Sequence, residues 1–112
     1  MKVAIVGSRS ITVENIGEYI PRDIEIDEII SGGAPGIDRC ARIYAEKMGI
    51  PFREILPQYA RFGRAAPIIR NKEIVLSADL VIALWDGTSR GTFSVLQYCR
   101  KNGVNFIVHK LK

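Results

Sequence analysis

One segment of the sequence has the residue types and spacing of an anion-binding turn. Three glycines, Gly32, Gly33 and Gly36, separate an apolar run that ends at Ser31 from an amphipathic pattern. Glycine lets the backbone approach a ligand closely, and the first amide groups of a helix point outward beside the positive end of its dipole. Residues 31–38 therefore predict a phosphate or nucleotide site. The expected contacts are Ser31, Gly32, Gly33, Ala34, Gly36 and Asp38.

This segment differs from the two common nucleotide-binding loops. It lacks the Gly-Lys-Ser/Thr ending of an ATP-binding P-loop, and it follows the second expected strand, whereas the dinucleotide fingerprint follows the first. ATP hydrolysis is therefore not expected. The alternative interpretation is a tight turn made by the glycines, with Asp38 capping a helix.

Two further turns carry residues that bind anions. Gly7, Ser8 and Arg9 follow the first apolar run, where the guanidinium of Arg9 is suited to a bidentate bond with phosphate. Gly91 and Thr92 begin a helical pattern and offer free amides and a hydroxyl group. The alternatives are a solvated surface arginine, and plain helix capping by Thr88 or Ser89.

Four other side chains complete the expected site. Arg70 and Asn71 lie within a helical pattern, where asparagine is unfavourable, so a role facing the ligand is favoured. Trp85 either stacks on a base, which contributes about 1–3 kcal/mol, or covers the sheet edge. Asp86 either accepts ribose hydroxyls or caps the turn that it forms with Gly87.

Alternating strand and helix patterns predict the fold that positions these residues. We expect one domain over residues 1–112, a three-layer Rossmann-like α/β sandwich whose parallel five-stranded sheet has the order 3-2-1-4-5. In that order, every candidate turn lies at the carboxyl edge of the sheet. The expected strands are 2–6, 28–31, 51–55, 78–84 and 105–109, and the expected helices are about 13–20, 37–48, 67–76 and 89–102. Residues Ile37, Ala41, Tyr44, Ala45 and Met48 share one face of the second helix.

Composition restricts the class of protein. The apolar runs at 3–6 and 80–85 are far shorter than the roughly 18 residues of a membrane span. The chain passes directly from Met1 and Lys2 into a strand pattern, so we expect a cytoplasmic protein. Cys40 and Cys99 have no partners at metal-ligand spacing and are expected in the core, with no metal site and no required cofactor. The net charge of +4 favours anionic ligands.

Four motifs, taken in order, resemble those of the SLOG superfamily. They are Gly7-Ser8-Arg9, residues 31–38, residues 59–71 and Gly91-Thr92. This Rossmann-like group includes the DNA-processing protein A family and the LOG phosphoribohydrolases, and the sequence is most similar to its small members of unassigned function. The resemblance implies a nucleotide or a nucleotide derivative, NAD-like or ADP-ribose-like, as ligand. In LOG enzymes a glutamate of the Gly-Gly-x-Gly-Thr-x-x-Glu motif acts on the ribosyl bond, and Val95 stands at that position here.

Three functions follow from these features. The first is a binding or sensing domain for a nucleotide, because the glutamate is absent. The second is a LOG-like hydrolase of nucleoside monophosphates, in which Asp86 replaces the glutamate. The third is binding of single-stranded nucleic acid by residues 59–72, which combine cations with Tyr59 and Phe62. Because the chain has room for only one domain, we also expect either self-association as a homodimer or binding to a partner.

Overall fold

The protein has an α/β fold built on a five-stranded parallel sheet. A computed structural model describes residues 1–111, and its strand order is β3-β2-β1-β4-β5, with every adjacent pair parallel. The predicted Rossmann-like fold and its strand order 3-2-1-4-5 are thus confirmed. The strands are β1 Lys2–Gly7, β2 Glu28–Ser31, β3 Phe52–Glu54, β4 Leu80–Trp85 and β5 Asn105–Lys110.

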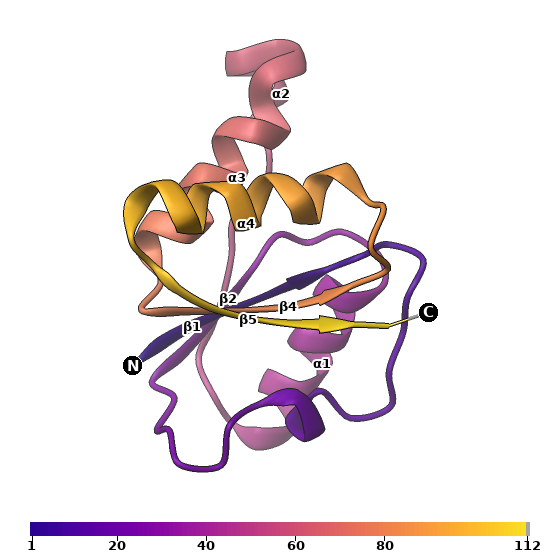
Figure 1. Ribbon diagram of the computed structural model, residues 1–112, viewed down its shortest axis with the longest axis vertical. Coiled ribbons are helices and arrows are strands. Elements are labelled where there is room, and N and C mark those ends of the chain that lie inside the picture. Colours follow the sequence, from indigo (N-terminus) through magenta and orange to yellow (C-terminus); the bar gives the residue numbers. More distant parts are fainter. Residues whose placement is uncertain (112) are drawn as a thin grey trace.

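Helices cover both faces of this sheet (Figure 1). One face carries α1 and the short helix η1, and the other carries α3 and α4. Adjacent residues of a strand point to opposite faces, so Ile5 packs in the α1 layer and Ala4 in the α3–α4 layer. The helices are η1 Ile16–Tyr19, α1 Ile37–Met48, α2 Tyr59–Phe62, η2 Gly63–Ala65, α3 Ala66–Ser77 and α4 Arg90–Asn102.

The interior strand β4, which lies between β1 and β5, is buried along nearly its whole length. Leu80 through Leu84 are buried, as the continuous apolar run predicts for a strand covered on both faces. Both core clusters take residues from β4: Ile82 and Leu84 belong to one, and Val81 and Ala83 to the other. The strand therefore connects the two halves of the core.

Three local predictions differ from the structure. The helix expected at 13–20 is only the 3-10 turn Ile16–Tyr19, capped by Asn15, because β-branched residues precede it and Gly17 lies within it. Met48, expected on the buried face of α1, is 56% exposed, since the face that reaches the core ends at Ala45. Residues 59–65 lie outside the expected strands and helices, yet they form α2 and η2 and project from the body with none of them buried (Figure 1).

Backbone geometry shows why glycine occupies certain positions. Gly49 and Gly103 directly follow the expected helices 37–48 and 89–102, and they end α1 and α4 in the left-handed conformation, both with φ of 68°. At Gly7 a Cβ atom would lie 2.3 Å from the carbonyl oxygen of Leu84 and 2.7 Å from the Cβ of Ile37. Gly7 thus permits a close approach of β1 to both α1 and β4.

No helix within the described part of the chain has the length and apolar character needed to cross a membrane. Cys99 is buried in the α3–α4 layer, and Cys40 is half-buried against the α1 layer, so both lie at the core as expected. Burial raises the pKa of the Cys99 thiol to about 11. This shift keeps the thiol protonated and unreactive at neutral pH.

Candidate functional site

A cavity of about 220 Å³ lies where β1, β2 and β4 end, at the carboxyl edge of the sheet. Ligands of open parallel α/β sheets bind at this edge, where the strand order reverses. The cavity is lined by Val6, Gly7, Arg9, Gly32, Ala34, Asp38, Arg70, Asn71, Ile74, Ser89, Arg90, Gly91, Thr92 and Val95. Loops far apart in the sequence therefore contribute to one concave surface.

Most of the residues predicted from the sequence line this cavity. Those that do are Gly7, Arg9, Gly32, Ala34, Asp38, Arg70, Asn71, Gly91 and Thr92. Those that do not are Ser8, Ser31, Gly33, Gly36, Trp85 and Asp86. Sequence reasoning missed Ser89 and Arg90, although their position directly before Gly91 at a helix start was a usable signal.

The two buried serines outside the cavity hold the strand ends together. Ser31 Oγ donates to the carbonyl oxygen of Ile5 at 2.6 Å, which links the ends of β2 and β1. Ser8 Oγ accepts a bond from the amide of Asp86 at 3.0 Å and lies 3.1 Å from Ser89 Oγ. These hydroxyl groups set the spacing between the loops that form the cavity wall.

Gly36 and Trp85 also contact other parts of the chain and do not line the cavity. Gly36 has φ of 79°, and a Cβ atom there would lie 2.5 Å from the carbonyl oxygen of Ser8, so the two loops meet backbone to backbone. The indole nitrogen of Trp85 donates to the carbonyl oxygen of Ser89 at 3.0 Å, and its ring stacks on Phe93. Trp85 thus contacts the start of α4 and lies beside the cavity.

The carboxylate of Asp86 caps the turn that leads into α4. It accepts bonds from the amides of Thr88 and Ser89, both at 2.8 Å, and these bonds lower the pKa of Asp86. Because Asp86 does not line the cavity, it is not placed to act on a ligand held there. Of the two roles considered for Asp86, the contacts in the structure are those of a turn cap and not those of a ribose-binding residue.

Asp38 is the one carboxylate that lines the cavity among the described residues. Its side chain is only 6% exposed; Oδ2 accepts a bond from the Ala34 amide at 3.1 Å, while the buried Oδ1 has no partner in the described part of the chain. Burial raises the pKa of Asp38, and the Ala34 amide and the charge of Arg70 offset part of this rise.

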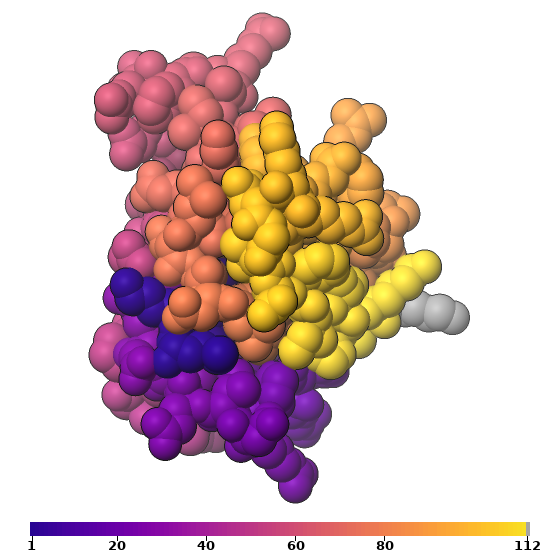
Figure 2. Space-filling model, turned by 60° about the vertical axis from the view of Figure 1, so that its left-hand side comes forward, coloured from indigo at the N-terminus to yellow at the C-terminus, as the bar shows by residue number. Residues whose placement is uncertain are grey.

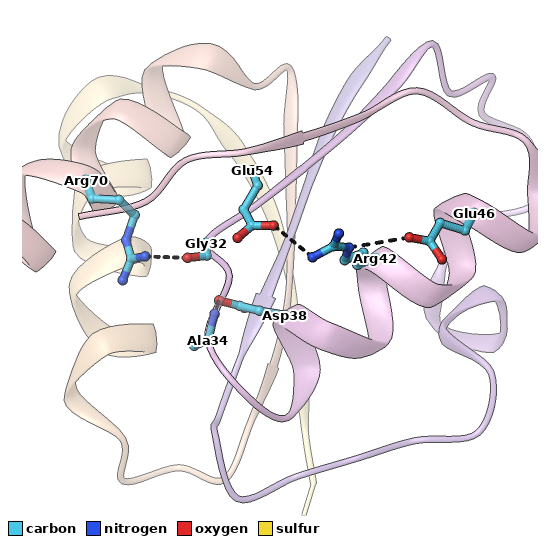
Figure 3. Close-up of polar contacts among 7 residues, drawn as sticks. All are labelled: Gly32, Ala34, Asp38, Arg42, Glu46, Glu54 and Arg70. Atoms are coloured by element: carbon cyan, nitrogen blue, oxygen red, sulfur yellow. Dashed lines mark hydrogen bonds and ion pairs between the residues drawn. The ribbon is translucent and has the colours of Figure 1, made fainter. Parts of the chain in front are cut away.

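Arg70 connects α3 to the turn after β2 (Figure 3). One of its terminal nitrogens donates to the carbonyl oxygen of Gly32 at 2.7 Å, and its Nε donates to Asn71 Oδ1 at 3.0 Å. A Cβ atom on Gly32 would lie 2.9 Å from both Arg70 and Asp38, so glycine leaves room for this pair of opposite charges. Arg70 therefore holds the cavity wall in place.

The two helix N-termini at this edge differ in what they offer an anion. At α1, the Ile37 amide donates to the Ser8 carbonyl and Asp38 occupies the first turn, so a negative group of the chain itself is already present. At α4, the first turn contains no acidic residue and the side chain of the N-cap Ser89 makes no capping bond. The Asp86 carboxylate accepts only the amides of Thr88 and Ser89, which precede the helix, so the amides of the first turn itself stay free. The free amides of α4 thus face the cavity beside the guanidinium-bearing Arg9 and Arg90.

Two hydroxyl groups add to this cluster. Ser89 Oγ donates to Thr92 Oγ1 at 3.1 Å, and both side chains line the cavity. Hydroxyls, amides and guanidinium groups are all donors that bind phosphate oxygens. Within residues 1–111 no group of three or more His, Cys, Asp or Glu side chains is arranged to hold a metal ion.

The chain thus has a Rossmann-like α/β fold, with a cavity lined by guanidinium, hydroxyl and amide donors at the carboxyl edge of its sheet. No protein family, curated protein or solved structure matches the chain.

Proposed function

We propose that the protein binds a nucleotide or nucleotide derivative, with a phosphate group at the N-terminus of α4. The observation that carries the proposal is the uncapped first turn of α4, which opens into the cavity together with Arg9 and Arg90. Neither arginine side chain forms a hydrogen bond or ion pair within the described residues, so both are available to an anion. Binding or sensing, rather than catalysis, is the function we favour.

Energetics favour a ligand larger than inorganic phosphate. Charge-assisted hydrogen bonds contribute about 1.5–3 kcal/mol each, while association costs about 4–15 kcal/mol. Two or three such bonds leave little net affinity, so a sugar or base must supply more contacts. The apolar side chains of Val6, Ile74 and Val95 line the same cavity and offer that surface.

Calorimetric titration with AMP, ADP-ribose and inorganic phosphate tests this proposal. We expect AMP or ADP-ribose to bind more tightly than phosphate, and Arg90→Gln to weaken binding about tenfold through the loss of a charge-assisted bond. The matched control is Arg22→Gln, which removes an exposed arginine that does not line the cavity. No binding of any of the three compounds, or equal weakening by both variants, would overturn the proposal.

The other two functions, the cytoplasmic location and the homodimer stay predictions. Release of free base from AMP tests the hydrolase, whose candidate carboxylate in the cavity is Asp38 rather than Asp86. A steep fall of oligonucleotide affinity with salt tests the nucleic-acid interface at residues 59–72.

A further inference from the structure

A second concavity of about 950 Å³ continues from the cavity along the groove between α3 and α4. The two helices lie side by side on the face drawn in Figure 2. Asn71, Arg90 and Gly91 line both hollows, so the groove adjoins the cavity. The side-chain amide of Asn71 donates to the Gly91 carbonyl oxygen at 3.4 Å at this boundary. The N-terminus of α4 therefore borders both hollows.

The groove carries positive charge without a compensating carboxylate. Arg90, Arg100 and Lys101 line it, no acidic residue does, and none of the three forms an ion pair with a carboxylate of residues 1–111. Arg100 lies over the ring of Phe106, which leaves Lys101 as the free cation at the far end. This charge favours an anionic occupant.

Helical spacing arranges the polar side chains of the groove in one line. Arg90, Gln97, Tyr98 and Lys101 recur at intervals that place them on a single face of α4. Arg90 and Lys101 are about 16 Å apart along the helix axis, at 1.5 Å per residue. Tyr98, half-buried between them, offers a ring against which a base can pack.

The size of the inner cavity indicates what extends into the groove. At about 220 Å³, the cavity is smaller than the roughly 300–1,000 Å³ of typical ligand pockets. It suits a phosphate with only part of the attached nucleoside, and the remainder of the ligand must lie outside. The groove is the adjoining hollow, since it shares wall residues with the cavity.

We infer that the α3–α4 groove is a second subsite, which binds a second phosphate of the same ligand through Lys101. The ligand class is a nucleotide that carries a second phosphate remote from the first, supplied either as a short oligonucleotide or as the end of a longer strand. This inference rests on the proposed function, because the first phosphate must be held at the N-terminus of α4.

The test compares AMP with the 5′-phosphorylated oligoadenylates pApA and pApApA by calorimetric titration. We expect affinity to rise along this series as the added phosphates approach Lys101. Lys101→Glu should weaken binding of pApApA by about fivefold, equivalent to about 1 kcal/mol, and leave AMP binding unchanged. A long oligoadenylate strand distinguishes the two sources, since tighter binding of the strand than of pApApA identifies single-stranded nucleic acid.

Lys47→Glu is the matched control, because Lys47 is the basic residue in the last turn of α1, on the opposite face of the sheet. It causes the same change in net charge and in helix-end electrostatics. Equal affinities for AMP and pApApA, or equal effects of the two variants on pApApA, would overturn the second subsite while leaving the proposed function standing. Failure of all the adenylates to bind would overturn both.

Discussion

Asp38 combines burial with an unpartnered oxygen, and its environment favours the neutral carboxyl group. The pKa of Asp38 is raised from its ordinary value of 3.8, mainly by burial. Such a group binds its proton more tightly in the folded state than in the unfolded state. Its contribution to the free energy of unfolding is complete at pH values below its pKa in the unfolded chain, and it is lost as pH rises through its pKa in the folded protein. Asp38 therefore favours folding less at neutral pH than in acid.

We expect Asp38→Asn to remove this dependence. The amide retains an oxygen that accepts the Ala34 bond and has no charge to bury. Relative to the parent protein, the variant should gain free energy of unfolding as pH rises from about 3.8 towards neutral, and should be at least as stable at neutral pH. Urea denaturation across this pH range measures the difference. Asp23→Asn, which alters an exposed carboxylate, is the control, and a difference that shrinks with rising pH would contradict the prediction.

Residue types identified much of the cavity wall, but not the partners of each side chain. Glycine and arginine at strand ends were informative because few other residues tolerate close backbone approach or bind phosphate bidentately. Ser31 and Asp86 have equally suitable chemistry, yet the structure commits them to the Ile5 carbonyl and to a turn. Such pairings depend on tertiary distances that a single sequence does not contain.

Helix ends were predicted well because their geometry is local. Gly103 has φ of 68° and a Cβ atom there would meet nothing within 4 Å, so any cost of substitution is conformational. We expect Gly103→Ala to lower the free energy of unfolding by about 1 kcal/mol, because the left-handed conformation is unfavourable for residues with a Cβ atom. Urea denaturation measures this change. Gly103→Asn should cost less, since asparagine tolerates that conformation, and the reverse ranking would contradict the explanation.

The stretch before β2 was harder to predict because tertiary contacts override its propensities. Thr12 and Asn15 have the side chains of helix caps, but Ile16 is buried beside the α1 layer and only one 3-10 turn forms. The projecting elements α2 and η2 were not predicted because they make too few tertiary contacts, not because such contacts override their propensities. They bury no side chain, so no apolar periodicity marks them.

At the scale of the whole molecule, one sheet separates two apolar layers that share the interior strands β1 and β4. Strand order was predictable because short right-handed crossovers leave few arrangements for this alternation of elements. A shared strand makes the layers depend on each other, so we expect a single cooperative unfolding transition.

Adjacent residues of β4 test this coupling. Val81 and Ile82 are both fully buried, and they face the α3–α4 layer and the α1 layer respectively. Val81→Ala and Ile82→Ala should each lower the free energy of unfolding, by about 2–5 kcal/mol for the isoleucine and less for the valine. Hydrogen exchange should show that either substitution reduces amide protection in both α1 and α4. Loss of protection confined to the layer that contains the substitution would show that the layers unfold independently.

Trp85 is the single tryptophan of the chain, and its indole nitrogen is bonded to the carbonyl of Ser89, the residue that begins the cavity wall at α4. Any occupant that shifts the start of α4 alters the polarity around this ring. The intrinsic fluorescence of the unmodified protein is therefore an optical reporter for that corner of the molecule, readable without a label and free of background from a second indole.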